Sequence, residues 1–213
     1  MKQQIIEALA SVLIAYDKII GLKLQSIKQR INSIRFSHKI TFRGGKTITI
    51  RKDAKIINPQ WIEVGENLTI GDRVTFSTWP LSDSKSNQIK LFVGNNCRFG
   101  DDSHITAANH IEIGDNFLSG KKVLITDNSH GNVTPDELSI APVKRKIVSK
   151  GPVYIGNNVW VGENAAILPG VTIGDGAIIG ANAIVTQNIP PGGIAVGNPA
   201  KIIKILNPQN NES

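Results

Sequence analysis

The stretch from Ile155 to Val185, IGNNVW-VGENAA-ILPGVT-IGDGAI-IGANAI-V, decides the fold. Aliphatic residues recur in it every six positions, at Ile155, Val161, Ile167, Ile173, Ile179 and Val185. Glycine directly follows several of them, at Gly156, Gly162, Gly174 and Gly180. A 3.6-residue helical period would spread these positions around a cylinder, and the two-residue period of a strand leaves the glycines unexplained. The repeat therefore predicts a parallel β-helix, with one strand and one turn per hexad and three hexads per triangular coil.

The same six-residue spacing extends the predicted β-helix toward the N-terminus. It recurs at Val64, Ile70 and Phe76, and again at Val93, Phe99 and Ile105. Small residues four places after the aliphatic ones are expected beside them in the interior, at Cys97, Ala165, Val171, Ala177 and Ala183. The glycines are expected to accept turn geometry that a side chain would obstruct. The polar run from Ser82 to Lys90 breaks the register and predicts a loop.

Composition narrows the class of protein. Of the 213 residues, 40% are hydrophobic but only 5% aromatic, which suits a narrow core of repeated aliphatic layers. The net charge of +7 favours acidic partners such as nucleotide phosphates or an anionic membrane, whereas no nucleic-acid-binding signature is present. The single cysteine excludes an internal disulfide and a cysteine-rich metal cluster. A reducing, cytoplasmic location is therefore expected.

Residues 1–36 interrupt the hexads and predict a helical segment, which Gly21 is expected to divide. Its apolar residues step by three or four along one stripe: Ile6, Leu9, Leu13, Tyr16, Ile20, Leu24, Ile27, Ile31 and Ile34. The longest uncharged run is far below the ~20 residues that span a bilayer. The stripe is expected to pack on the β-helix or on a neighbouring subunit. Because basic residues outnumber acidic ones here, peripheral contact with the inner face of the membrane is the open alternative.

Several motifs resemble those of the hexapeptide-repeat acyltransferases of the sugar O-acetyltransferase type, which are usually trimers of left-handed parallel β-helices. The motifs are IGNNVWVG, ILPGVTIGDG, IPPGGIAVGNPAK and the isolated His130. The resemblance implies a mainly β fold over residues 37–206, preceded by the helical segment and followed by a flexible tail, 207–213. The segment KIIKIL predicts a short C-terminal helix. Between Ile125 and Ile155 the hexads fail, which predicts an excursion loop at about 131–151.

His130, at the base of the excursion, is the strongest candidate for catalysis. In the resembled acetyltransferases a histidine eighteen residues into a segment that opens with IGDN is the general base, and Ile113 opens that segment here. Imidazole titrates near ~6.5, so it accepts a proton from an attacking hydroxyl at neutral pH. The spacing between His110 and His130 predicts that they stack on successive coils, about 4.8 Å apart.

Two aspartates are candidates for substrate binding. Asp102 falls where related sugar acetyltransferases often carry an acceptor-binding asparagine, but an ionised carboxylate cannot donate a hydrogen bond. A turn aspartate is the alternative there. Asp127 could orient the His130 imidazole or form an Asx-type turn.

The resemblance places acetyl-CoA on the C-terminal coils. The matching positions are Trp160, Glu163, Ala181, Thr186, Lys201 and Lys204. Glu163 stands where serine is common and Gln187 where lysine is common, so neither is expected to hold a phosphate. No metal is expected.

The leading interpretation is an acetyl-CoA-dependent O-acetyltransferase that acts on a sugar or glycan hydroxyl in cell-surface polysaccharide or lipopolysaccharide assembly. N-acetylation of an amino sugar, or a serine or xenobiotic acceptor, would use the same scaffold. A zinc carbonic anhydrase on the same β-helix would need His104, His110 and His130 as ligands. A non-catalytic scaffold is the remaining alternative.

Overall fold

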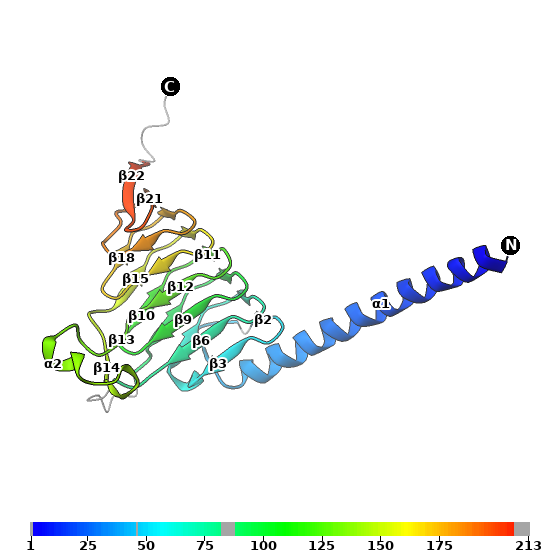
Figure 1. Cartoon of the computed structure of the whole chain (residues 1–213), viewed down its shortest axis with the longest axis horizontal. Helices are drawn as coiled ribbons and strands as arrows, with labels where there is room; N and C mark the ends of the chain where they lie inside the picture. Colours follow the sequence, from blue (N-terminus) through cyan, green and yellow to red (C-terminus); the bar gives the residue numbers. More distant parts are fainter. Residues whose placement is uncertain (1, 46, 82–87, 207–213) are drawn as a thin grey trace, which may run out of the picture.

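The computed structural model describes residues 2–45, 47–81 and 88–206. Short strands stack in triangular coils from β2 and β3 at one end to β22 at the other, and helix α1 (Lys2–Ser37) projects from the first coils (Figure 1). The predicted tail, 207–213, and most of the predicted loop from Ser82 to Lys90 lie outside the described residues.

Three parallel sheets form the sides of the prism. Sheet A contains β1 (Thr41–Phe42), β4 (Ile62–Val64), β7 (Leu91–Val93), β10 (Ile111–Ile113), β15 (Val153–Ile155) and β18 (Thr172–Ile173). Sheet B contains β2 (Ile48–Ile50), β5 (Leu68–Ile70), β8 (Arg98–Phe99), β11 (Leu118–Ser119), β16 (Trp160–Val161), β19 (Ile178–Ile179), β21 (Gly193–Val196) and β22 (Lys201–Ile205). Sheet C contains β3 (Lys55–Ile57), β6 (Thr75–Thr78), β9 (His104–Ala107), β12 (Leu124–Thr126), β17 (Ala166–Ile167) and β20 (Ile184–Val185).

Short elements fill the connections. The 3-10 helix η1 (Pro59–Trp61) precedes β4. The excursion holds β13 (Ser129–His130), helix α2 (Pro135–Leu138), the 3-10 helix η2 (Pro142–Lys144) and β14 (Ile147–Val148). Strands β13 and β14 pair antiparallel as a separate small sheet, so the excursion has its own hydrogen-bonded base.

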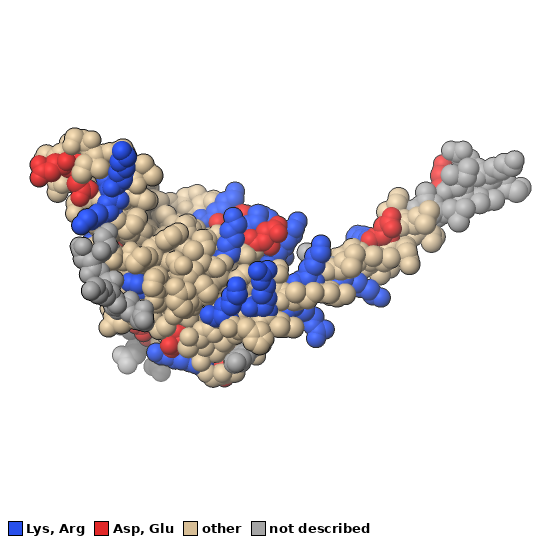
Figure 2. Space-filling view, turned by 90° about the horizontal axis from the view of Figure 1, so that it is seen from below, with Lys and Arg blue, Asp and Glu red and all other residues tan. Residues whose placement is uncertain are grey.

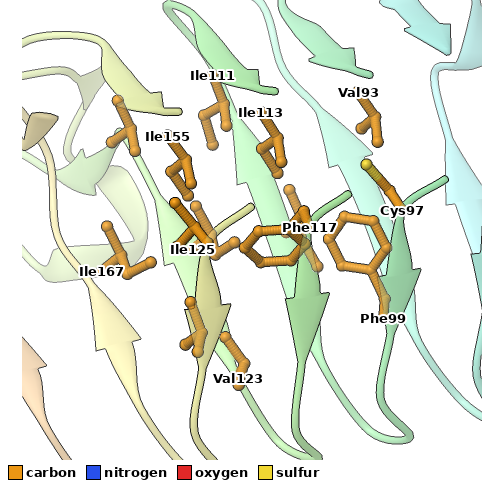
Figure 3. Close-up of a cluster of buried hydrophobic side chains, with 14 of the residues drawn as sticks. Val93, Cys97, Phe99, Ile111, Ile113, Phe117, Val123, Ile125, Ile155 and Ile167 are labelled. Carbon is orange, nitrogen blue, oxygen red and sulfur yellow. The ribbon is translucent and has the colours of Figure 1, made fainter. Parts of the chain in front are cut away.

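The predicted interior is confirmed. All six aliphatic residues of the opening repeat are at most 3% exposed. The small residues Ala165, Val171, Ala177 and Ala183 are equally buried. Figure 3 shows successive coils contributing side chains to one continuous core, among them Cys97, Phe99 and Phe117. Burial raises the pKa of the Cys97 thiol to about 11, so this cysteine is an inert interior residue.

The repeated glycines serve a different purpose from the one expected. A β-carbon on Gly162 would lie 2.5 Å from the backbone nitrogen of Ala181 in the next coil, so close approach of coils requires glycine there. The left-handed backbone of the turns is carried two residues later, for example by Asn164 (φ 59°) and Asn182 (φ 60°). Asparagine tolerates this conformation better than most residues.

Helix α1 is continuous through Gly21, so the expected division of the segment is wrong. Its C-terminal turns meet the β-helix through Ser33, whose hydroxyl accepts a hydrogen bond from the Ile50 backbone at 2.9 Å, and through Phe36, which packs against the core. The apolar stripe points elsewhere and remains exposed, so it does not pack on its own β-helix as one expectation held. Among the described residues, no helix is long and apolar enough to cross a bilayer.

Two further expectations are corrected. The segment KIIKIL forms strand β22 rather than a helix, because it pairs antiparallel with β21 and closes sheet B. The partner stacked on His110 is Pro152 rather than His130, since Val153 donates its backbone N–H to the His110 carbonyl. The chain leaves the prism before His130, which pairs with Ile147 instead.

Candidate functional site

A hollow of about 740 Å³ lies against the outer face of sheet C, beneath the excursion. His130 lines it from strand β13, and its side chain is exposed. The rest of the lining comes from sheet C and from the excursion: Trp79, His104, Thr106, Leu124, Thr126, Asn128, Ser129, Val143, Arg145 and Ile147. The hollow therefore combines two imidazoles, hydroxyl groups, an amide and a guanidinium group with the apolar side chains of Trp79, Leu124, Val143 and Ile147. These groups suit a polar acceptor with several hydroxyls.

Asp127 holds the corner from which His130 departs. Its carboxylate is buried and accepts hydrogen bonds from the backbone N–H groups of Ala108 (2.8 Å) and Asn109 (2.9 Å) and from the Asn128 amide (3.0 Å). Ala108 and Asn109 belong to the preceding coil, so the carboxylate joins two coils at the corner instead of forming an Asx-type turn. Asp127 thus shapes the base of the hollow through the backbone.

Lys90 supports the same corner from the interior. The side chain is buried, and its ammonium group donates to the Ala108 carbonyl at 2.6 Å. Burial lowers the pKa of Lys90, and the charge of Asp127 opposes that shift. A buried cation and a buried carboxylate therefore brace consecutive backbone groups just below the excursion.

The structure adds His104 to the hollow, a residue to which sequence reasoning gave a role only in the zinc alternative. His104 lies on β9 beside Leu124 of β12, and its Nε2 is 3.1 Å from the Ser77 hydroxyl. Although part of the residue is exposed, burial of its ring lowers the pKa of His104 below 6.5. His104 is therefore a neutral imidazole at physiological pH.

The low pKa of His104 predicts a loss of stability in acid. Because the unfolded state binds a proton at this residue more readily than the folded state, stability falls as pH drops below 6.5 and levels off below the folded-state pKa. We expect Tm to fall less steeply over that window in His104→Gln than in the unchanged protein. Thermal melts at closely spaced pH values check this, and identical slopes would contradict it.

Trp79 and Arg145 also enter the hollow without having been predicted. Arg145 belongs to a basic cluster of the excursion, with Lys144, Lys146 and Lys150. Its Nε donates to the Ile140 carbonyl at 2.9 Å, so the side chain is held in place. The available signal in the sequence was the alternation of inward and outward side chains along β6 and β9, which shows which residues reach the outer face of sheet C.

Asp102 lies away from His130, on the corner between sheets B and C. Its carboxylate forms a bidentate salt bridge with Arg73, in which Nε lies 2.6 Å from Oδ1 and Nη2 lies 2.7 Å from Oδ2. The hydrogen bond from Arg73 lowers the pKa of Asp102. Asp102 is therefore an ionised turn residue (φ 61°) that does not line the hollow of its own chain.

The predicted CoA residues lie on the upper coils, in three places. Trp160 is 52% exposed on the outer face of sheet B, between Leu118 and Ile178 on the neighbouring strands. Glu163 and Ala181 are adjacent on the corner between sheets B and C, where the Asn182 N–H donates to the Glu163 carbonyl.

The remaining CoA candidates flank those positions. Thr186 is exposed directly after β20. Lys201 and Lys204 are exposed on β22, paired with Val196 and Ile194. Trp160 and the lysines thus belong to sheet B, whereas His130 belongs to the hollow on sheet C. One chain does not bring the two groups together.

The three histidines of the zinc alternative do not converge, because His104 and His130 line the hollow while His110 lies elsewhere. His110 lies outside the hollow, where its ring faces Tyr154 at 5.8 Å and its Nε2 is 3.3 Å from a Glu112 carboxylate oxygen. Within residues 2–45, 47–81 and 88–206, no three His, Cys, Asp or Glu side chains form a group that could hold a metal ion. The arrangement does not support a carbonic-anhydrase centre.

Known proteins resemble this chain over most of its length. The family described as bacterial transferase hexapeptide (six repeats) matches residues 152–187. The putative lipopolysaccharide biosynthesis O-acetyl transferase WbbJ of Escherichia coli K12 is 34% identical over 161 residues, which are 74% of this chain and 79% of that protein. Galactoside O-acetyltransferase of the same organism is 28% identical, over 74% of this chain and 70% of that protein.

Solved structures share the fold. A maltose O-acetyltransferase from Clostridium difficile 630 aligns with a TM-score of 0.50 and 27% identity, covering 85% of this chain and 88% of that one. AntD, an N-acyltransferase from Bacillus cereus in complex with dTDP and 3-hydroxybutyryl-CoA, aligns with a TM-score of 0.64 and 21% identity, covering 84% and 88%. The architecture is consistent with the left-handed β-helix expected of such proteins.

Proposed function

Because the chain belongs to the bacterial hexapeptide transferases, we propose that it transfers the acetyl group of acetyl-CoA to a sugar hydroxyl. The observation that carries the proposal is the hollow on sheet C, where His130 is exposed among hydroxyl and amide groups. The similarity to WbbJ favours a glycan acceptor in lipopolysaccharide or polysaccharide assembly.

The reaction needs only one proton carrier. His130 accepts the proton of the sugar hydroxyl, whose oxygen attacks the thioester carbonyl carbon of acetyl-CoA. The carbon–sulfur bond then breaks, and the CoA sulfur leaves with the proton that His130 returns. Asp127 and Lys90 fix the corner that carries His130, so the imidazole is positioned without a hydrogen bond from either residue.

The separation of Trp160 from His130 supports a site shared by subunits. In a homotrimer, the sheet B face of one subunit, with Trp160, Lys201 and Lys204, lies against the hollow of the next. Trp160 supplies a flat wall for the pantetheine or adenine of CoA. Lys201 and Lys204 supply point charges for its phosphates.

The acceptor class is tested with purified protein, radiolabelled acetyl-CoA, and a panel of neutral sugars and amino sugars. We expect labelled products that alkaline hydroxylamine cleaves, because under these conditions it attacks O-acetyl esters and leaves amides intact. Hydroxylamine-resistant label on amino sugars alone would identify an N-acetyltransferase. Absence of both CoA binding and transfer would favour the non-catalytic scaffold.

Trp160→Ala is expected to weaken CoA binding by roughly 10-fold, since a stacked aromatic contributes about 0.5–1.5 kcal/mol beyond its buried area. Calorimetric titration with CoA measures the change. Tyr154→Ala is the matched control, because it removes an aromatic of similar exposure from sheet A. Equal CoA affinity in Trp160→Ala and the unchanged protein would contradict this role for the sheet B face.

A further inference from the structure

Helix α1 carries an apolar stripe that nothing in the described chain covers. Its described members are between 37% and 62% exposed: Leu13, Tyr16, Ile20, Leu24, Ile27, Ile31 and Ile34. Val12, Ile14, Ile19 and Leu22 widen the apolar surface in the same part of the helix. Exposed apolar surface of this extent marks an interaction site.

The helix meets the β-helix with its opposite face. Ser33 and Phe36 make the contacts with the first coils. At 3.6 residues per turn, these positions lie about 100–180° around the helix from Ile27, Ile31 and Ile34. Most of the stripe therefore faces away from the body of the protein, and only its edge residues Leu24 and Ile34 line hollows between α1 and the first coils. The exposed stripe needs a different partner.

Basic residues line both edges of the stripe. By the same helical geometry, Lys23 and Arg30 lie along one edge and Lys28 and Arg35 along the other. The sequence contains no acidic residue from Lys18 through Lys52. In the described part of the helix, none of these four cations takes part in a salt bridge. Figure 2 shows Lys and Arg side chains along α1 and gathered where it joins the coils.

This charge pattern decides which partner fits. If two copies of α1 paired through the stripe, the basic edges of one helix would lie against the basic edges of the other in either direction, and like charges at these flanking positions disfavour pairing. A bilayer surface with anionic headgroups accepts both features, because the stripe enters the acyl boundary while Lys and Arg extend to the phosphates.

We propose that α1 is a peripheral membrane anchor that lies in the plane of an anionic phospholipid bilayer. Its 36 residues form an arm about 54 Å long, which holds the β-helix next to the surface. Tyr16, with a polar tip on the stripe, suits the headgroup level. Membrane binding does not require acetyl transfer. Taken together with the proposed function, which is a separate premise, the anchor implies that the acceptor is a membrane-linked glycan.

Flotation of the full-length protein with vesicles tests the anchor. Vesicles of phosphatidylcholine containing about 30% phosphatidylglycerol are compared with pure phosphatidylcholine. We expect binding to the anionic vesicles that weakens as NaCl rises from about 0.1 to 0.5 M, because salt screens the headgroup charges. The variant Lys23→Gln, Lys28→Gln, Arg30→Gln, Arg35→Gln should bind roughly 10²–10³-fold more weakly.

A charge-matched control carries Lys55→Gln, Lys122→Gln, Lys144→Gln and Lys150→Gln, which are exposed positions outside α1, and should bind like the unchanged protein. Ile20→Ser with Ile27→Ser tests the stripe itself and should also reduce binding. All variants should keep their activity toward a small soluble sugar, so failure of the anchor and failure of the proposed reaction are distinguishable. The proposal would be overturned if the four-fold α1 variant bound anionic vesicles as tightly as the unchanged protein. It would also be overturned if the unchanged protein formed assemblies larger than a trimer in solution and Ile20→Ser with Ile27→Ser broke them. That second result would identify a second copy of the chain as the partner.

Discussion

His130→Ala is expected to lower kcat for acetyl transfer by roughly 10²–10⁴-fold, because a positioned general base contributes a factor of this size. Initial rates with saturating acetyl-CoA and acceptor measure the effect. The imidazole is exposed at the hollow and lies on the short strand β13, so its removal leaves the buried core unchanged. Affinity for CoA and Tm should therefore stay close to their original values.

His110→Ala is the matched control for that loss. It removes another imidazole from the chain, but one that faces Tyr154 and Glu112 outside the hollow. We expect nearly unchanged kcat in this variant. A large loss in His110→Ala, together with full activity in His130→Ala, would refute the assignment of the general base.

Phe117→Ala is expected to lower the free energy of unfolding by about 3–5 kcal/mol, as for other large aromatic residues removed from cores. Phe117 is 1% exposed, and its ring centroid lies 5.1 Å from that of Phe99. Its loss leaves a cavity between coils, which rigid backbone hydrogen bonds on both sides keep from closing. Urea unfolding at fixed protein concentration measures the change.

Leu118→Ala provides the comparison for the packing effect. Leu118 is the next residue on the same coil, but it points outward and is 47% exposed. We expect the free energy of unfolding of the Leu118→Ala subunit to change by less than about 0.5 kcal/mol. Similar destabilisation by both substitutions would show that the coil's backbone, rather than the Phe117 side chain, is sensitive at this point.

The hexads predicted the core well because each position depends on local geometry. A residue's place within its hexad sets whether its side chain points inward, as the burial of Ile155 through Val185 shows. The size of each buried residue was harder to predict. Ser119 occupies an aliphatic position of the repeat and Phe117 a position expected to be small, yet both are buried. The room for the Phe117 ring comes from the neighbouring coil, where it packs against Phe99.

The candidate site was predicted less completely. His130 followed from the resemblance to the hexapeptide acetyltransferases, through its spacing to Ile113. By contrast, His104, Trp79 and Arg145 join it through the stacking of coils and the folding back of the excursion. Their sequence distance from His130 varies with the length of loops. The stacking of His110 was predicted wrongly for the same reason, since the chain departs from the prism before His130 and Pro152 takes that place.

By itself, the sequence determined the β-helix, its aliphatic interior and the apolar stripe of α1. Each of these rests on a period that local backbone geometry converts directly into a side-chain direction. The catalytic candidate His130 came instead from the resemblance to a known family. Only the tertiary structure decided which face of α1 meets the coils, that KIIKIL is a strand, and that Trp160 and His130 lie on different sheets. These features depend on contacts between different segments, which for KIIKIL is the neighbouring strand β21, and no repeat within one segment encodes them.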